Sequence, residues 1–359
     1  MAGRPRSRRG CRKYVQSLVT IGVFGILLLA GAVWFFWSAL QSPYRGYEEP
    51  AKRFEVRRGM RTATILRHLQ GEGVLRDEYV PLIYMKLLRN RDSVKAGLYE
   101  FDRPMSAVDV LDKLIRGDVI LESVTVREGL DRFAVGRLFA EAGFGTDEQW
   151  EAATSDSEPV RDIAPEAESL EGYLFPDTYK FAPGTPVPTI VRSMVDNFRR
   201  NFVKEMALIA TGLSLHDTVI LASIVETEAR IADERPIVAS VYVNRIRKNM
   251  LLGADPTVIY ALKLDGRWDG NIRKPDLQID SPYNTYRYRG LPPGPIANPG
   301  LASLRAASAP ATTNLLYFVA RQDGTHAFST NLDEHNRNVE VYQRQFYRDQ
   351  RKAAANAGR

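Results

Sequence analysis

The stretch LASIVETEAR, which ends at Arg230, holds the side chain best suited in this sequence to acid–base chemistry. Glu226 follows an apolar run, and on a helix it would share a face with Ala222 and Ser223, whose small side chains would let a ligand approach. Partial burial favours the protonated form of a carboxyl group, which a general acid needs. The alternative is an exposed i,i+4 ion pair between Glu226 and Arg230. Glu228, on another side of the helix, is predicted to be solvated or structural.

A second candidate is EGYLFPDTY, in which two acids are set among aromatic residues around a proline turn. Glu171 and Asp177 are the acids, and Tyr173 is one of the aromatic residues. Segments this aromatic either dock onto a core or line a cleft, and the residues alone leave both interpretations open.

A third candidate begins at Ser281 and reads SPYNTYRYRGLPPGPIANPG. Its Tyr283 and Tyr286 offer flat apolar faces, and Asn284 and Thr285 offer an amide and a hydroxyl. Such a combination suits sugar rings, which present C–H faces and a rim of hydroxyl groups. A strand that places alternate tyrosines on one side is the structural alternative. The glycine- and proline-rich end is typical of a stiff loop that walls a groove.

Periodicity and caps predict an α+β fold around these segments. Asp255 is predicted to cap a helix, with Pro256 in its first turn and Thr257 within it. The remaining predicted elements of the second half are helices at 188–203, at 219–231 after a Ser214 cap, from Pro236 and from Leu332, and paired strands at 315–320 and 326–330.

The first half contains an internal repeat. FEVRRGMRTATILRHLQGEGV, from Phe54, matches VTVREGLDRFAVGRLFAEAGF, from Val124, at a constant offset of 70 residues. Each copy reads as a strand, a glycine-containing turn and a helix, and duplication of a small binding module is the preferred interpretation. We therefore predict a module region at 54–144, a polar linker at 145–170, a catalytic domain at 171–350 and a tail at 351–359.

The N-terminus has the pattern of a membrane anchor. A basic tail (1–17) precedes an uncharged apolar stretch at 18–40 that ends in an aromatic cluster, and a polar tether (41–53) follows. A helix of about 20 residues spans a hydrocarbon core of ~30 Å. The positive-inside rule then keeps the N-terminus cytoplasmic and exports the rest, which favours a bacterial inner-membrane protein with a periplasmic catalytic part. A cleaved signal peptide is the alternative, but its apolar core is shorter.

Charge and motifs exclude several function classes. The net charge of +6 comes from the N-terminal tail, so the exported part has no net basic field to attract nucleic acid. No phosphate-binding glycine loop, metal-ligand spacing or serine-hydrolase elbow is present, so no cofactor or metal is predicted.

The segments EGYLFPDTY, LASIVETEAR, DPTVIYAL and YNTYRYRGLPPGPIANPG, followed by LYFVA and the C-terminal histidines, resemble the endolytic murein transglycosylase (YceG-like) family in order and spacing. The resemblance covers nearly the whole exported chain. It implies one inner-membrane span, a periplasmic catalytic domain and a membrane-proximal LysM-like part, a fold that binds N-acetyl sugars.

The resemblance also implies a reaction. It is cleavage, without water, of the β-1,4 bond between N-acetylmuramic acid and N-acetylglucosamine within peptidoglycan strands. The products are 1,6-anhydro ends, and the cleavage would terminate nascent strands. The family's catalytic glutamate falls on Glu226, and Asp177 would be a supporting residue. The implied substrate contacts are Glu171, Tyr173, Asp255, Thr257, Tyr283, Asn284, Thr285 and Tyr286.

Two other functions remain open from the residues. One is a muramidase that uses water, and the other is a membrane-anchored scaffold that binds glycan without cleaving it. In each case the expected partners are peptidoglycan strands and the membrane, with peptidoglycan synthases as further candidates.

Overall fold

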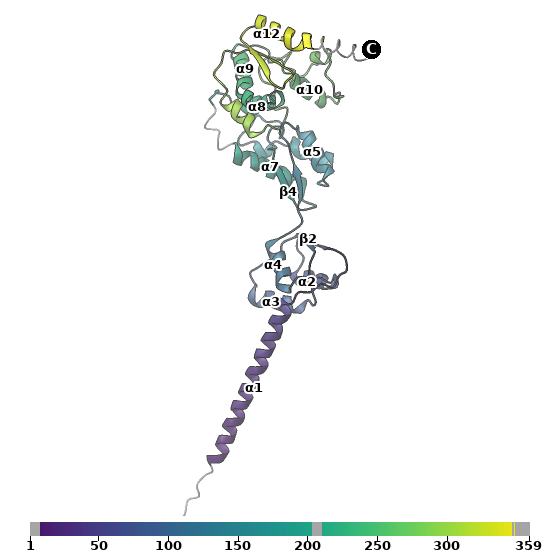
Figure 1. Cartoon of the computed structure of the whole chain (residues 1–359), viewed down its shortest axis with the longest axis vertical. Helices are drawn as coiled ribbons and strands as arrows, with labels where there is room; N and C mark the ends of the chain where they lie inside the picture. Colours follow the sequence, from purple (N-terminus) through teal and green to yellow (C-terminus); the bar gives the residue numbers. More distant parts are fainter. Residues whose placement is uncertain (1–7, 203–209, 347, 349–359) are drawn as a thin grey trace, which may run out of the picture. The chain divides into compact units, whose positions relative to one another are not determined.

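The computed structural model describes residues 8–202, 210–346 and 348, with the backbone alone for 8–16. The predicted tail at 351–359 and the first seven residues of the basic tail lie outside the described residues. The chain divides into two compact units, Met1–Leu121 and Glu122–Arg359. Both units mix helices with short antiparallel strand pairs (Figure 1), which agrees with the predicted α+β class.

The first unit begins with the helix α1 (Arg8–Gln41). The part from Ser17 to Gln41 is long and apolar enough to cross a membrane, as predicted for 18–40. Its large apolar side chains are exposed from Leu18 to Trp37, whereas Leu40 is fully buried. Only the C-terminal end of α1 therefore belongs to the core of this unit.

The rest of the first unit surrounds one strand pair. β1 and β2 are antiparallel, with Phe54 opposite Tyr99, and the inward side chains of β1 alternate as Phe54 and Val56. Helices cover this small sheet and complete an apolar core. The elements are β1 (Lys52–Val56), α2 (Thr62–Gly71), α3 (Tyr79–Leu88), β2 (Gly97–Phe101) and α4 (Ala107–Arg116).

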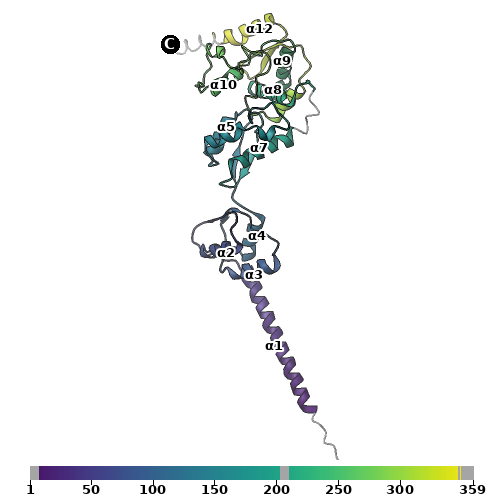
Figure 2. The ribbon, with the colours of Figure 1, turned by 180° about the vertical axis from the view of Figure 1, so that it is seen from behind.

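The second unit contains a larger core, around the helix α8 (Leu215–Glu228). α9 (Arg235–Arg247) and α11 (Leu301–Ser308) both pack against α8, and Figure 2 shows the same unit from behind. The other elements are β3 (Glu122–Thr125), α5 (Arg132–Glu141), α6 (Asp147–Ser155), β4 (Thr178–Phe181), α7 (Val187–Asn201), α10 (Asp255–Leu264), β5 (Tyr317–Ala320), β6 (His326–Ser329) and α12 (Leu332–Val339).

One predicted helix cap differs from the structure. Ala254 is the N-cap of α10, and Asp255 is the first helical residue. The Asp255 side chain instead accepts a hydrogen bond from Tyr286. α10 is tied to α5 by an ion pair between Lys263 and Asp131, which is the N-cap of α5.

The two copies of the internal repeat have the same local structure. Each is a strand, a turn and a helix, and the turn glycines Gly59 and Gly129 have φ angles of 82° and 80°. At the ends of their helices Gly73 and Gly143 are also left-handed, a conformation that costs glycine little. The repeat is thus a repeat of structure, while the LysM-like assignment stays a prediction.

The division between the units differs from the predicted boundary. The second copy of the repeat lies in the second unit, where β3 pairs with β4, and residues 145–170 contain α6, which packs on α5 and α7. Trp150 of α6 is 1% exposed. Acidic and polar composition suggested a linker, but a few large apolar side chains suffice to fold this segment into the core.

Candidate active site

α8 places Glu226 at the edge of the core. Ser214 caps the helix by accepting a hydrogen bond from the Asp217 N–H, and the side chains of Val219–Val225 are all buried. A helix that is apolar on every side is stable only inside a core. Glu226 lies in the last turn, where α8 reaches the surface, so its carboxyl group is anchored by a rigid buried element.

The Glu226 carboxylate is held by two donors and is almost covered. Its side chain is 6% exposed. Arg235, at the start of α9, approaches Oε1 with its Nη2 at 3.3 Å, and the Gly300 N–H donates to Oε2 at 3.0 Å. The cation partner is thus Arg235 rather than the predicted Arg230. Each oxygen has its own donor, which fixes the orientation of the carboxylate.

An open groove of about 610 Å³ has Glu226 among its lining residues. The paired strands β3 and β4 contribute to it together with the turn after β3 and the segment before β4. The end of α8, the residues after it and the start of α9 contribute the remaining side chains. The lining residues are Thr125, Val126, Arg127, Glu128, Pro176, Asp177, Thr178, Glu226, Ala229, Arg230 and Arg235. The second copy of the repeat therefore contributes directly to the groove.

Glu128 is the site residue that sequence reasoning missed. Its Oε2 lies 3.8 Å from the same Arg235 Nη2 that contacts Glu226. Burial and the charge of Glu226 raise the pKa of Glu128, and Arg235 partly opposes this. Glu128 lies in the VREG turn of the second repeat copy, where the sequence gives no reason to expect more than an ordinary turn residue. No local signal could reveal that Glu226, far along the chain, lies beside it.

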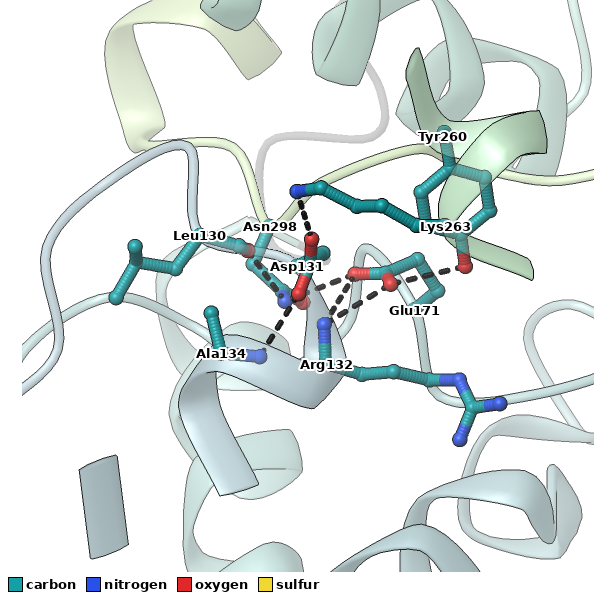
Figure 3. A network of polar contacts seen from close by, with 8 residues as sticks. All are labelled: Leu130, Asp131, Arg132, Ala134, Glu171, Tyr260, Lys263 and Asn298. Atoms are coloured by element: carbon teal, nitrogen blue, oxygen red, sulfur yellow. Dashed lines mark hydrogen bonds and ion pairs between the residues drawn. The ribbon is translucent and has the colours of Figure 1, made fainter. Parts of the chain in front are cut away.

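Asn298 joins segments that are far apart in the sequence, and Figure 3 shows its contacts with Leu130 and Glu171. Its Oδ1 accepts hydrogen bonds from the N–H groups of Gly172 and Leu174, both at 2.9 Å. Its Nδ2 donates to the Leu130 carbonyl and to Glu171. The side chain is completely buried. Asn298 thereby holds the Glu128 turn, the EGYLFPDTY segment and the loop before Gly300 in one arrangement.

Glu171 is a structural residue, which corrects the predicted substrate contact. Its carboxylate is enclosed and accepts hydrogen bonds from the Arg132 N–H at 3.0 and 2.9 Å, from Tyr260 at 3.0 Å and from Asn298 at 3.0 Å. Burial raises the pKa of Glu171 to about 8, although the Arg132 hydrogen bond opposes the shift. With 1% of its surface exposed, it cannot reach a glycan in this arrangement.

Tyr173 also lies in the core rather than on a groove wall. It is 0% exposed, and its hydroxyl group lies 2.7 Å from His216 Nδ1. Ala222 and Ser223 are equally buried, and Ser223 Oγ accepts the Ile296 N–H. The small residues of α8 therefore let the proline-rich loop pack closely against the helix. The sequence analysis predicted that they would let a ligand approach instead. The aromatic segment docks onto a core because its rings find apolar partners there.

The predicted contacts near α10 divide into buried and accessible residues. The accessible ones are Asp255 and Tyr286, joined by a 2.6 Å hydrogen bond, and the partly buried Tyr283. Thr257, Asn284 and Thr285 are at most 1% exposed. Their polar groups stabilise the loop itself, as when Asn284 donates to the Leu277 and Ile279 carbonyls. For these three, the prediction of direct sugar contact is corrected.

Glu228 is half-buried rather than solvated. Its Oε1 accepts a 3.4 Å hydrogen bond from Tyr242, and burial, together with the charge of Asp255, raises the pKa of Glu228 to about 7. This carboxyl group faces the Asp255–Tyr286 side of α8. Glu226 and Glu228 therefore lie in two different environments, although only one residue separates them in the sequence.

The comparison with protein families concerns most of the chain. The model of the YceG-like family matches residues 54–341. The chain belongs to the YceG-like family. The family resemblance seen in the motifs is thereby confirmed, and the matched residues include Glu128, Glu226, Arg235 and Asn298.

Relatives of this YceG-like chain carry a functional name. A Bacillus subtilis protein named endolytic murein transglycosylase is 30% identical over 334 residues, which are 88% of this chain and 91% of the relative. A Streptococcus pneumoniae protein of the same name is 29% identical, and the match covers 90% of this chain and 64% of that one.

A solved structure is also similar. The crystal structure of a YceG-like protein from Listeria monocytogenes matches 81% of this chain and 99% of its own, with 30% sequence identity and a TM-score of 0.56. The YceG-like match is therefore one of fold as well as of sequence.

Proposed function

We propose that the chain is a lytic transglycosylase that cleaves peptidoglycan strands internally, between N-acetylmuramic acid and N-acetylglucosamine. The observation that carries this proposal is Glu226, a nearly covered carboxyl group that faces an open groove and has a separate donor on each oxygen. The names of the Bacillus and Streptococcus relatives support it.

In the proposed reaction Glu226 acts first as an acid and then as a base. Its proton passes to the glycosidic oxygen as the bond from that oxygen to muramic C1 breaks, and C1 develops oxocarbenium character. The muramic C6 hydroxyl group then attacks C1 and gives its proton to Glu226. The products are a free 4-hydroxyl group and a 1,6-anhydro ring, and the glutamate returns to its starting state.

Arg235 and the Gly300 N–H would stabilise Glu226 while it is ionised, between the two proton transfers. When Glu226 has given up its proton, both donors face the resulting negative charge, and charge-assisted hydrogen bonds are among the stronger ones. They are fixed by α9 and by the N-terminus of α11, so they need no rearrangement when the charge develops. Asp177 and Thr178 line the groove and are candidates for contacts with sugar hydroxyl groups.

The membrane topology belongs to the same proposal. α1 would anchor the chain in the inner membrane, with residues 1–13 in the cytoplasm and the part of the chain after Gln41 on the periplasmic side. An enzyme held there meets new glycan strands close to the synthases that make them, and its cleavage would terminate their elongation. Asp255, Tyr283 and Tyr286 are proposed as further glycan contacts because they remain accessible.

A water-using muramidase is the second candidate, and Glu128 is the observation that favours it. A second carboxyl group near the first is the usual equipment of a glycoside hydrolase. Digestion of purified sacculi in H₂¹⁸O separates the two reactions. We expect glycan fragments that are lighter by one water than the corresponding hydrolysis products and that carry no ¹⁸O. Reducing muramic ends labelled with ¹⁸O would establish the muramidase instead, and intact sacculi would favour the scaffold.

We further propose that Glu128 is a positioning residue that acts through Glu226 and Arg235. Glu128→Gln keeps the shape of the side chain but removes its negative charge, which interacts with Arg235 alongside Glu226. We expect the rate of glycan cleavage to fall roughly tenfold, the equivalent of about one pKa unit of lost interaction, and the pH–rate profile to shift. Measurement of that profile is needed, because a purely structural role would lower the rate at every pH by the same factor.

Gly300→Ala provides a second way to displace Glu128. A Cβ at position 300 would overlap the Glu128 carboxylate, whereas the Gly300 φ of −76° suits alanine. The N–H that bonds Glu226 is retained. We therefore expect the alanine variant to change the pH–rate profile as Glu128→Gln does. Wild-type profiles in both variants would show that Glu128 has no part in the reaction.

A further inference from the structure

The helix α3 carries an exposed apolar face. Tyr79, Ile83 and Leu87, spaced by four residues, are 66%, 45% and 71% exposed, and at that spacing they share one side of the helix. We call these three residues the α3 face. On the opposite side, Pro81 and Met85 are buried in the core of the first unit.

This exposure is concentrated on α3. Outside α1, the described part of the first unit exposes five large apolar side chains, and four of them are Tyr79, Ile83, Leu87 and Leu88. Core packing does not require them, because Pro81 and Met85 already attach the helix. Scattered surface apolar residues are ordinary, but a contiguous set on one face indicates an interaction surface.

The position of α3 relative to α1 identifies the partner. α3 and α4 both pack against α1, and the side chains of α1 are covered only toward its C-terminal end, where Leu40 is buried. Trp34 and Trp37 precede that end and are 72% and 50% exposed. Tryptophans at the end of a spanning helix lie at the level of the lipid headgroups. α3 is therefore attached to α1 at that level.

The composition of α3 also suits a membrane interface. The sequence YVPLIYMKLL contains no acidic residue, and its one charged side chain, Lys86, is exposed beside the α3 face. Tyrosine and lysine at the border of an apolar stripe place their polar ends among headgroups while the stripe enters the acyl region.

We propose that the α3 face lies in the outer interface of the lipid bilayer. This proposal rests on the proposed membrane anchoring by α1 and adds a second attachment beside it. A single spanning helix leaves the first unit free to tilt with that helix relative to the membrane plane, whereas a second attachment fixes one face of the unit against the lipid.

The test is a fluorescence depth measurement on the full chain in phosphatidylethanolamine–phosphatidylglycerol vesicles. The single cysteine, Cys11, is replaced by serine, and an environment-sensitive dye is attached at Leu87→Cys. Lipids with quenchers at known depths then locate the dye. We expect a depth of about 5–10 Å below the headgroup boundary and a blue-shifted emission.

Two matched sites complete the design. Val23→Cys, within α1, reports the anchor itself, and Arg57→Cys, on a side chain that is 78% exposed, reports a surface in water. Quenching at Val23 with a water-exposed dye at Leu87 would overturn the α3 proposal and leave the anchor intact. A dye at Leu87 that is shielded but not quenched by lipid would show a second copy or another protein on the face, and would also overturn it.

Discussion

Replacement of Glu226 by glutamine is expected to lower the rate of anhydro-end formation by roughly 10²–10⁴-fold, the usual contribution of a general acid or base. Glutamine has nearly the same shape and can still accept one of the two hydrogen bonds from Arg235 and Gly300. It cannot carry a proton to the glycosidic oxygen or receive one from the C6 hydroxyl group. Release of soluble anhydro-muropeptides from purified sacculi, per enzyme and per minute, measures the change.

Glu141→Gln is the matched control. Glu141 is the last residue of α5 and is exposed, so the same chemical change there should leave the rate unaltered. Equal urea midpoints for both variants and the wild type would show that folding is preserved. If the Glu226→Gln protein digests sacculi as fast as the wild type, another group transfers the proton and the proposed mechanism is wrong.

Replacement of Glu171 by alanine is expected to destabilise the second unit by about 3–5 kcal/mol. The change removes the acceptor for three buried donors, the Arg132 N–H, the Tyr260 hydroxyl and the Asn298 amide. Each unsatisfied donor costs free energy because no water replaces the lost partner. Urea unfolding of the full chain in detergent measures the loss.

The pH dependence of stability gives a second readout for the same residue. The pKa of Glu171 is about 8 in the folded chain, against an ordinary value of 4.5. Between these values the folded state keeps a proton that the unfolded state releases, so the free energy of unfolding falls as pH rises from about 4.5 to about 8. Below this window Glu171 is protonated in both states, so its ionisation does not change the stability with pH. Above the window it is ionised in both states, and the decrease in the free energy of unfolding is complete.

Glu171→Gln separates the two effects. Glutamine mimics the protonated acid, so we expect it to be tolerated better than alanine near pH 5 and to lack the stability change that Glu171 contributes across that window. Glu168→Ala, an exposed substitution in the same segment, should change the free energy of unfolding by less than about 0.5 kcal/mol. A Glu171→Ala protein as stable as this control would show that the network of Figure 3 contributes little.

Local sequence patterns determined a large part of this protein. The apolar stretch at 18–40 predicts the apolar part of α1, because the length and composition of the stretch alone show that a helix there could span a bilayer. Spacing and the Ser214 cap predict α8 with Glu226 in its last turns, and the turn glycines of the repeat set the same left-handed backbone twice. Motif order identified the family. The helices and the turns depend on residues that are close in sequence, and the family assignment depends on the order of motifs along the chain.

Only the tertiary structure decided which side chains meet in the groove and which are enclosed. Asn298 bonds Gly172 across 126 residues and Glu171 across 127, and Arg235 brings Glu128 toward Glu226. Those contacts bury Glu171 and Tyr173, expose the turn that carries Glu128 to the groove, and assign the second repeat copy to the second unit. Burial of a polar group depends on what the rest of the chain packs around it, and residue type and spacing do not contain that information.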